Sequence, residues 1–154
     1  MPKLNLEEAE VRTACAYPPP YDQHCKGRSK IALGDLGGLT QFGVNLTRLA
    51  PGAASALKHW HENEDELVYM LEGEAVLVED DGETVLRPGD VATFKAGVAN
   101  GHMAVNRSSA DAVFLEVGTR AAEEVSSYTD TQVNLQMVKG PEGWAAYRKD
   151  GTRY

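Results

Sequence analysis

The 154-residue sequence lacks several features that would place it in a specialised class of protein. It contains no run of about 20 apolar residues, so no membrane-spanning helix is predicted. Its 15 basic residues are outnumbered by 23 acidic residues, for a net charge of −8, and no long basic run occurs. This balance argues against nucleic acid or an anionic membrane surface as a partner, but it leaves room for a locally positive small-molecule site.

Cysteine is also scarce, since Cys15 and Cys25 are the only two and both lie in the N-terminal segment. Disulfide frameworks usually contain more cysteines, so we expect both to be reduced thiols. The opening stretch MPKLNLEEAEVR has charges where a signal peptide would have an apolar segment. The expected compartment is therefore the cytoplasm.

Helical periodicity is rare along the chain, whereas short runs suited to β-strands are common. Asp81-Gly82 and Pro88-Gly89-Asp90 separate some of these runs and predict tight turns. Many short strands divided by turns are typical of an all-β sandwich or barrel, and this length suits one domain. The β-compatible runs cover residues 39–49, 67–79, 83–89, 91–94, 102–106 and 112–118.

The two ends of the chain are predicted to lie outside this barrel core. Residues 1–38 form an extended N-terminal arm in this prediction, because the prolines of YPPPY (17–21) favour extended backbone. Residues 39–118 form the barrel core. Residues 119–154 are expected to be a mostly irregular tail that packs on the barrel or on a partner subunit, with a short helix over 121–128.

The stretch HWHENEDE (residues 59–66) concentrates metal-binding side chains in the middle of the chain. Alternate residues of a strand share a face, so His59 and His61 would point the same way. Glu66 opens the next strand-like run, and a turn would bring it opposite this pair. With His102 near a later strand, three imidazoles and one carboxylate would suit a divalent ion such as iron, manganese, nickel or zinc.

Other polar residues around these strands receive weaker assignments. Glu62 and Glu64 are expected to be solvated loop residues, and His24 is expected to be a surface residue rather than a ligand. In the strand around residue 45, the more apolar face is predicted to point into the core. That face carries Phe42, Val44, Leu46 and Arg48.

The glycines and ligand candidates together resemble the two sequence motifs of the cupin superfamily, over about residues 39–118. The first motif, G-x-H-x-H-x-E-x-G with its characteristic gaps, is filled by Gly52, His59, His61, Glu66 and Gly73. The second motif is represented by Gly89, Gly97, His102 and Asn106, with Lys95 standing where a proline is usual.

The spacing of the second motif leaves two positions open for the fourth ligand. Counting forward from Gly97 leads to Asn100, whereas counting back from Asn106 leads to His102. Strand alternation also supports His102, which we therefore expect to be the ligand.

The resemblance implies an antiparallel double-stranded β-helix, the jelly-roll barrel, with one divalent metal ion per chain and often a homodimer. It implies an enzyme for a small oxygenated substrate, such as a sugar, sugar phosphate or organic acid, with isomerase- or epimerase-type Lewis-acid chemistry. An iron-dependent dioxygenase and a non-catalytic small-molecule sensor are the alternatives. Asn45, Lys95 and Asn100 are candidate substrate contacts, and Lys95 would suit an anionic substrate.

Overall fold

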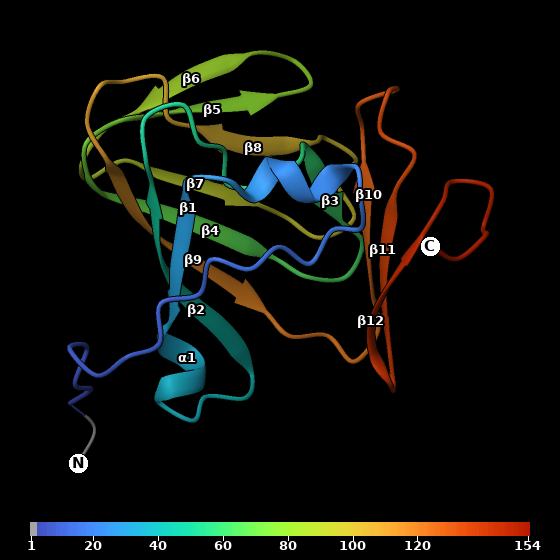
Figure 1. The fold of residues 1–154 in the computed structure, drawn as a ribbon, viewed down its shortest axis with the longest axis horizontal. Helices are drawn as coiled ribbons and strands as arrows, with labels where there is room; N and C mark the ends of the chain where they lie inside the picture. The colour runs from blue at the N-terminus through green and yellow to red at the C-terminus, as the bar shows by residue number, and fades with distance from the viewer. Residues whose placement is uncertain (1–2) are drawn as a thin grey trace.

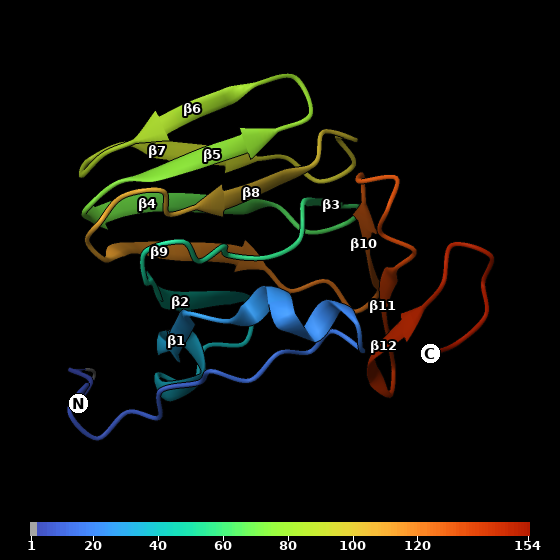
Figure 2. The same ribbon diagram turned by 45° about the horizontal axis from the view of Figure 1, so that its top comes forward.

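The computed structural model describes residues 3–154, which form two antiparallel sheets that close into a jelly-roll barrel (Figures 1 and 2). The all-β prediction is confirmed. The five-stranded sheet has the order β1 (Arg28–Ala32), β2 (Phe42–Leu49), β9 (Ala112–Thr119), β4 (Glu66–Glu72) and β7 (Val91–Phe94). The seven-stranded sheet has the order β12 (Gly143–Tyr147), β11 (Gln136–Gly140), β10 (Glu124–Tyr128), β3 (His59–His61), β8 (His102–Val105), β5 (Ala75–Glu79) and β6 (Glu83–Leu86).

The turn between β4 and β5 explains one of the motif glycines. Gly73 has a φ of +68°, a backbone conformation that side chains other than glycine rarely adopt. A Cβ atom at this position would lie 2.2 Å from the carbonyl oxygen of Asp111, which is far inside van der Waals contact. Only glycine therefore lets the β4–β5 turn pass this close to the start of β9.

A hydrophobic core fills one end of the barrel between the two sheets. Leu49, Met70 and Phe114 are fully buried there. The prediction that the Phe42 face of β2 points inward is wrong, because Phe42 is 39% exposed while Thr47 is fully buried. The inner face of β2 is polar because it borders a cavity. In most strands of alternating polarity the apolar face points inward, so the sequence pattern indicated the wrong face.

The segment after residue 118 contains strands β10, β11 and β12, although the sequence predicted a mostly irregular tail. The predicted helix over 121–128 is wrong, since residues 124–128 pair with both β3 and β11. Glu124, Ser126 and Tyr128 are the buried residues of β10. Two of these three are polar. The buried face of β10 therefore lacks the alternating apolar residues that would have indicated a strand in the sequence. In Figures 1 and 2, β10–β12 stand at one end of the barrel.

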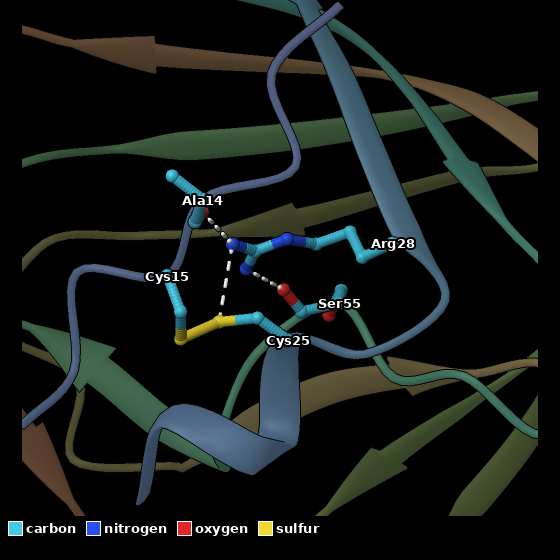
Figure 3. Close-up of a disulfide and its surroundings, with 5 residues drawn as sticks. All are labelled: Ala14, Cys15, Cys25, Arg28 and Ser55. Carbon is cyan, nitrogen blue, oxygen red and sulfur yellow. Dashed lines mark hydrogen bonds between the residues drawn. A yellow bond between two sulfur atoms is a disulfide. The ribbon is translucent and has the colours of Figure 1, made fainter. Parts of the chain in front are cut away.

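A disulfide between Cys15 and Cys25 closes a loop within the N-terminal arm, so the prediction of reduced thiols is wrong. The short 3-10 helix η1 (Tyr21–Cys25) turns the chain back and brings the two Cα atoms to 5.5 Å, a normal disulfide separation. Figure 3 shows the guanidinium of Arg28 beside Cys25. It donates hydrogen bonds to the Cys25 sulfur at 3.3 Å and to the Ser55 carbonyl at 2.7 Å.

Arm and tail take part in the sheets, since β1 pairs with β2 along its whole length and β10 pairs with β3. The division into arm, core and tail, and the homodimer, stay predictions. Within residues 3–154, neither α1 (Leu33–Leu36) nor any other helix has the length and apolar character needed to span a membrane.

Candidate metal centre

Strand β3 presents two histidines to the barrel interior. The Nδ1 atom of His59 lies 2.7 Å from the carbonyl oxygen of Leu57, which can only accept a hydrogen bond. His59 therefore carries its proton on Nδ1, and its Nε2 keeps a free lone pair. That Nε2 lies 3.2 Å from the Nε2 of His61. Two ring nitrogens thus face each other across the interior.

Two further residues complete the group from other strands. Glu66 is the first residue of β4, in the opposite sheet, and His102 on β8 lies directly across from His59 in the β3–β8 pairing. The Oε2 atom of Glu66 is 3.0 Å from the Nε2 of His102 and 3.6 Å from the Nε2 of His61. Three imidazoles and one carboxylate therefore converge from both sheets.

The ring of His102 is held by stacking. Its centroid lies 3.6 Å from that of Phe94, with only 6° between the ring planes. Among residues 3–154, its Nδ1 is the single fully buried side-chain nitrogen or oxygen without a hydrogen-bond partner. Phe94 thus fixes the ring so that Nε2 points toward Glu66.

Three of these residues, His59, His61 and Glu66, form a group that could hold a divalent cation. The ligand atoms of His59, His61 and Glu66 all lie within 4.8 Å of one another, and a cation between them would relieve the repulsion of facing lone pairs. The alternative fourth ligand points elsewhere, because the Asn100 amide donates to Glu79 at 3.2 Å and accepts from the Asp80 backbone at 3.1 Å. The geometry favours His102.

The protonation states also suit metal binding. Burial lowers the pKa of His59 to about 4, because the charged imidazolium loses its hydration. Burial alone would raise the pKa of Glu66, but the hydrogen bond from His102 and the nearby imidazoles outweigh it and lower this pKa to about 2. At neutral pH His59 is neutral and Glu66 is ionised, as ligands must be.

The lowered pKa values predict that metal-free protein loses stability in acid. Unfolded His59 binds a proton below its ordinary pKa of about 6.5 but folded His59 does so only near pH 4, so protonation favours unfolding as pH falls between these values. Glu66 adds a further loss as pH falls from about 4.5 toward 2. We expect the His59 contribution to be about 3 kcal/mol.

Urea unfolding of chelator-treated protein at pH 7, 5.5 and 4 measures this loss. His59→Gln should lose less free energy of unfolding between pH 7 and pH 4 than the unsubstituted protein. Equal losses in the two proteins would contradict the assigned protonation.

A cavity of about 470 Å³ opens beside the ligand group, and Asn45 lies in its wall. Lys95 and Asn100 do not line this cavity but a smaller one of about 200 Å³. The two cavities share His61, Glu64, Phe94 and His102. The sequence-predicted substrate contacts therefore lie on two different sides of the ligand group.

Two acidic residues near His61 were not identified from the sequence. Glu64 is not a solvated loop residue, since its side chain is only 14% exposed and accepts hydrogen bonds from the Ala121 backbone and from Lys139. Glu124 is fully buried, 3.7 Å from the Nδ1 of His61. No local pattern could have linked these residues, because the fold brings them together from distant parts of the chain.

The charges around the large cavity cancel. Four basic side chains line it, from Arg28, Lys30, Arg120 and Lys139. Four carboxylates line it as well, from Glu64, Asp65, Glu66 and Glu116. Among the side chains that line the cavity, a divalent ion held by the imidazoles would therefore add two positive charges to a balanced set.

Comparison with known proteins agrees with this architecture. The family model described as the cupin domain matches residues 45–118. A crystal structure of a sugar phosphate isomerase from a cupin superfamily, from Silicibacter pomeroyi, is 48% identical, with a TM-score of 0.95, over 99% of this chain and 96% of that one. A protein from Acidithiobacillus ferrooxidans, provisionally named a sugar phosphate isomerase, is 28% identical, with a TM-score of 0.73, over 82% of this chain and 80% of that one.

More distant structures share the fold alone. The polyketide cyclase from Streptomyces resistomycificus is 20% identical, with a TM-score of 0.63, over 77% of this chain and 79% of that one. No curated protein matches the chain.

Proposed function

This chain belongs to the cupin superfamily, and we propose that within it the protein is a metal-dependent isomerase of sugar phosphates. The Silicibacter pomeroyi protein that carries this name is similar along nearly the whole chain, including the strands outside residues 45–118 that line the cavity. The similarity therefore extends to the walls that would contact a substrate.

The observation that carries the proposal is the charge of the cavity. Its own side chains cancel, so a divalent ion would give it two positive charges, and a phosphate monoester has between about −1.5 and −2 at neutral pH. A volume of about 470 Å³ suits a ligand of this size. A neutral sugar would leave the excess charge unbalanced, which favours the phosphorylated substrate.

The residues that would hold the ion are His59, His61, Glu66 and His102. A divalent ion bound there supplies Lewis acidity, which polarises a carbonyl group. The chain itself would orient the substrate. Lys139 and Arg120 line the cavity and place positive charge in its wall for the phosphate. Lys139 lies 3.4 Å from the Glu64 carboxylate, and Arg120 forms an ion pair with Asp35.

An interconversion assay tests the proposal. Tag-free protein, reconstituted with iron(II), manganese, nickel or zinc, is incubated with triose, pentose and hexose phosphates, and products are followed by NMR. We expect aldose–ketose interconversion that depends on the metal and is lost with the unphosphorylated sugars. Absence of interconversion with every metal would contradict the proposed isomerase function. Dioxygen uptake by the iron form would then indicate a dioxygenase. Binding of the sugar phosphate without turnover would indicate a sensor.

A further inference from the structure

A charged pair lies in the cavity wall formed by the five-stranded sheet. The Nζ atom of Lys30 on β1 is 2.5 Å from the Oε2 atom of Glu116 on β9, and their side chains are 26% and 11% exposed. The hydroxyl of Thr47 on β2, which is fully buried, donates to the same oxygen at 3.0 Å. Charges are costly to bury, so this pair needs a reason beyond packing.

The second carboxylate oxygen of Glu116 is free. Both hydrogen bonds that Glu116 accepts within residues 3–154 end on Oε2. Oε1 is not sealed in the protein either, because His102 Nδ1 is the single fully buried polar side-chain atom without a partner in this part of the chain. Since Glu116 lines the large cavity, Oε1 is an open acceptor that faces it.

The sheet register puts this oxygen near the candidate metal centre. Glu66 on β4 lies opposite Gly118, and Glu116 is two residues further along the same face of β9. Diagonal neighbours of this kind are about 7–8 Å apart. Gly118 lies opposite Gly43 on β2, and both line the cavity without side chains that would fill it. Glu66 and Glu116 therefore lie along one glycine-lined strip of the cavity wall, with the Arg120 side chain against Gly43.

From this geometry we propose that Glu116 is the catalytic residue that moves the proton during isomerisation, with Lys30 and Thr47 as its positioning residues. The inference rests on the proposed function. A substrate whose carbonyl lies at Glu66 and the imidazoles would place its next carbon, which carries a hydroxyl, beside Oε1.

The step balances without any co-reactant. Glu116 Oε1 takes the proton from the hydroxyl-bearing carbon, and the C–H electron pair forms a C=C bond while the carbonyl π pair moves to oxygen. The resulting enediolate carries one hydroxyl and one negatively charged oxygen. The hydroxyl proton passes to the charged oxygen, and Glu116 returns its proton to the former carbonyl carbon, which leaves a carbonyl on the neighbouring carbon and an ionised Glu116. The former carbonyl carbon is reduced by two electrons and the hydroxyl-bearing carbon is oxidised by two electrons, so no external oxidant or reductant is needed.

Lys30 fits this cycle electrostatically. It pairs with the ionised carboxylate before the proton moves. Once Glu116 is protonated and neutral, the ammonium faces the negative charge that develops on the substrate oxygen. A charge already in position costs no reorganisation at that moment.

The other acidic groups around the cavity are less suited to this role. Glu66 is directed at the imidazoles, and both oxygens of Glu124 accept backbone hydrogen bonds. Burial raises the pKa of the Tyr128 phenol above its usual value, so it stays protonated and is no base. Glu64 and Asp65 are the remaining rivals, although Glu64 Oε1 already accepts from the Ala121 backbone and Lys139, and Asp65 Oδ1 accepts from the Ala96 backbone.

The experiment compares metal-loaded wild-type protein with Glu116→Gln, Glu64→Gln and the exposed β4 control Glu72→Gln. Turnover of the sugar phosphate and incorporation of deuterium from D₂O are followed by NMR, with metal content and urea unfolding measured in parallel. We expect Glu116→Gln to lower both rates by about 10³-fold at unchanged metal content. Glu72→Gln should match wild type.

Three further variants separate chemistry from structure. Glu116→Asp keeps the charge but withdraws the carboxylate, so it should lower turnover at least about tenfold even if the glutamine variant folds poorly. Lys30→Gln should lower kcat about tenfold with little change in KM, and Lys30→Arg should restore most of it.

Wild-type-like turnover in both Glu116 variants would overturn this inference alone, as would loss of turnover in Glu64→Gln with Glu116→Gln active. Wild-type protein that interconverts no sugar phosphate would overturn the proposed function and this inference together.

Discussion

Replacing His59 or His102 with alanine is expected to lower the affinity for divalent metal by more than 10²-fold. Loss of a residue that only supports a ligand costs about 10–100-fold, and loss of the ligand itself should cost more. Both residues contribute an Nε2 atom to the group around Glu66, so neither can be replaced by the other.

The measurement is elemental analysis of protein purified without an affinity tag, followed by competition with a chelating dye. His24→Ala is the matched control, because His24 is exposed in η1 and far from this group in the sequence. Asn100→Ala should also keep its metal. Loss of metal in Asn100→Ala with retention in His102→Ala would assign the fourth position to Asn100, and metal-free wild type after reconstitution would refute the centre.

Glu124→Ala is expected to lower the free energy of unfolding by about 1–3 kcal/mol. Its carboxylate accepts hydrogen bonds from the backbone N–H groups of Glu62 at 2.8 Å and Asn63 at 2.9 Å. The N–H of Glu62 also donates to the Val125 carbonyl at 3.1 Å, so the Asn63 N–H is the donor that would lose its acceptor, at a cost of about 1–3 kcal/mol. The same carboxylate lies 3.7 Å from the Nδ1 of His61, so we also expect metal affinity to fall about tenfold.

Urea unfolding of the metal-free protein gives the first quantity, and dye competition gives the second. Glu123→Ala is the natural control, because the neighbouring Glu123 is exposed and its substitution should change stability by less than about 0.5 kcal/mol. Equal effects of the two substitutions would show that the buried carboxylate does not support the loop after β3.

The barrel strands and the ligand spacing were predictable because each depends on local pattern. His59 and His61 share a face through the two-residue period of a strand. Such features can be read without knowing which strands become neighbours. The turn at Gly73 was missed, because residues 67–79 were predicted as one run although the structure divides them into β4 and β5.

The cavity walls were not predictable, because their polar residues face inward. Thr47 is fully buried and Phe42 is exposed, so apolar alternation indicated the wrong face of β2. Strand β10 was missed for the same reason, because its buried residues Glu124 and Ser126 are polar. The contact between Glu62 and Glu124 joins residues 62 positions apart and depends on the register of β10 against β3.

Part of the cavity wall comes from stretches of the chain that contain none of the ligand candidates. His59, His61, Glu66 and His102 all fall within residues 45–118, the part that the cupin domain model matches. Tyr17, Lys30, Tyr128, Lys139 and Trp144, which lie outside that part, line the cavity around them. Substitutions in the arm and in the last three strands can therefore change the shape and charge of the cavity without replacing any of the four ligand candidates.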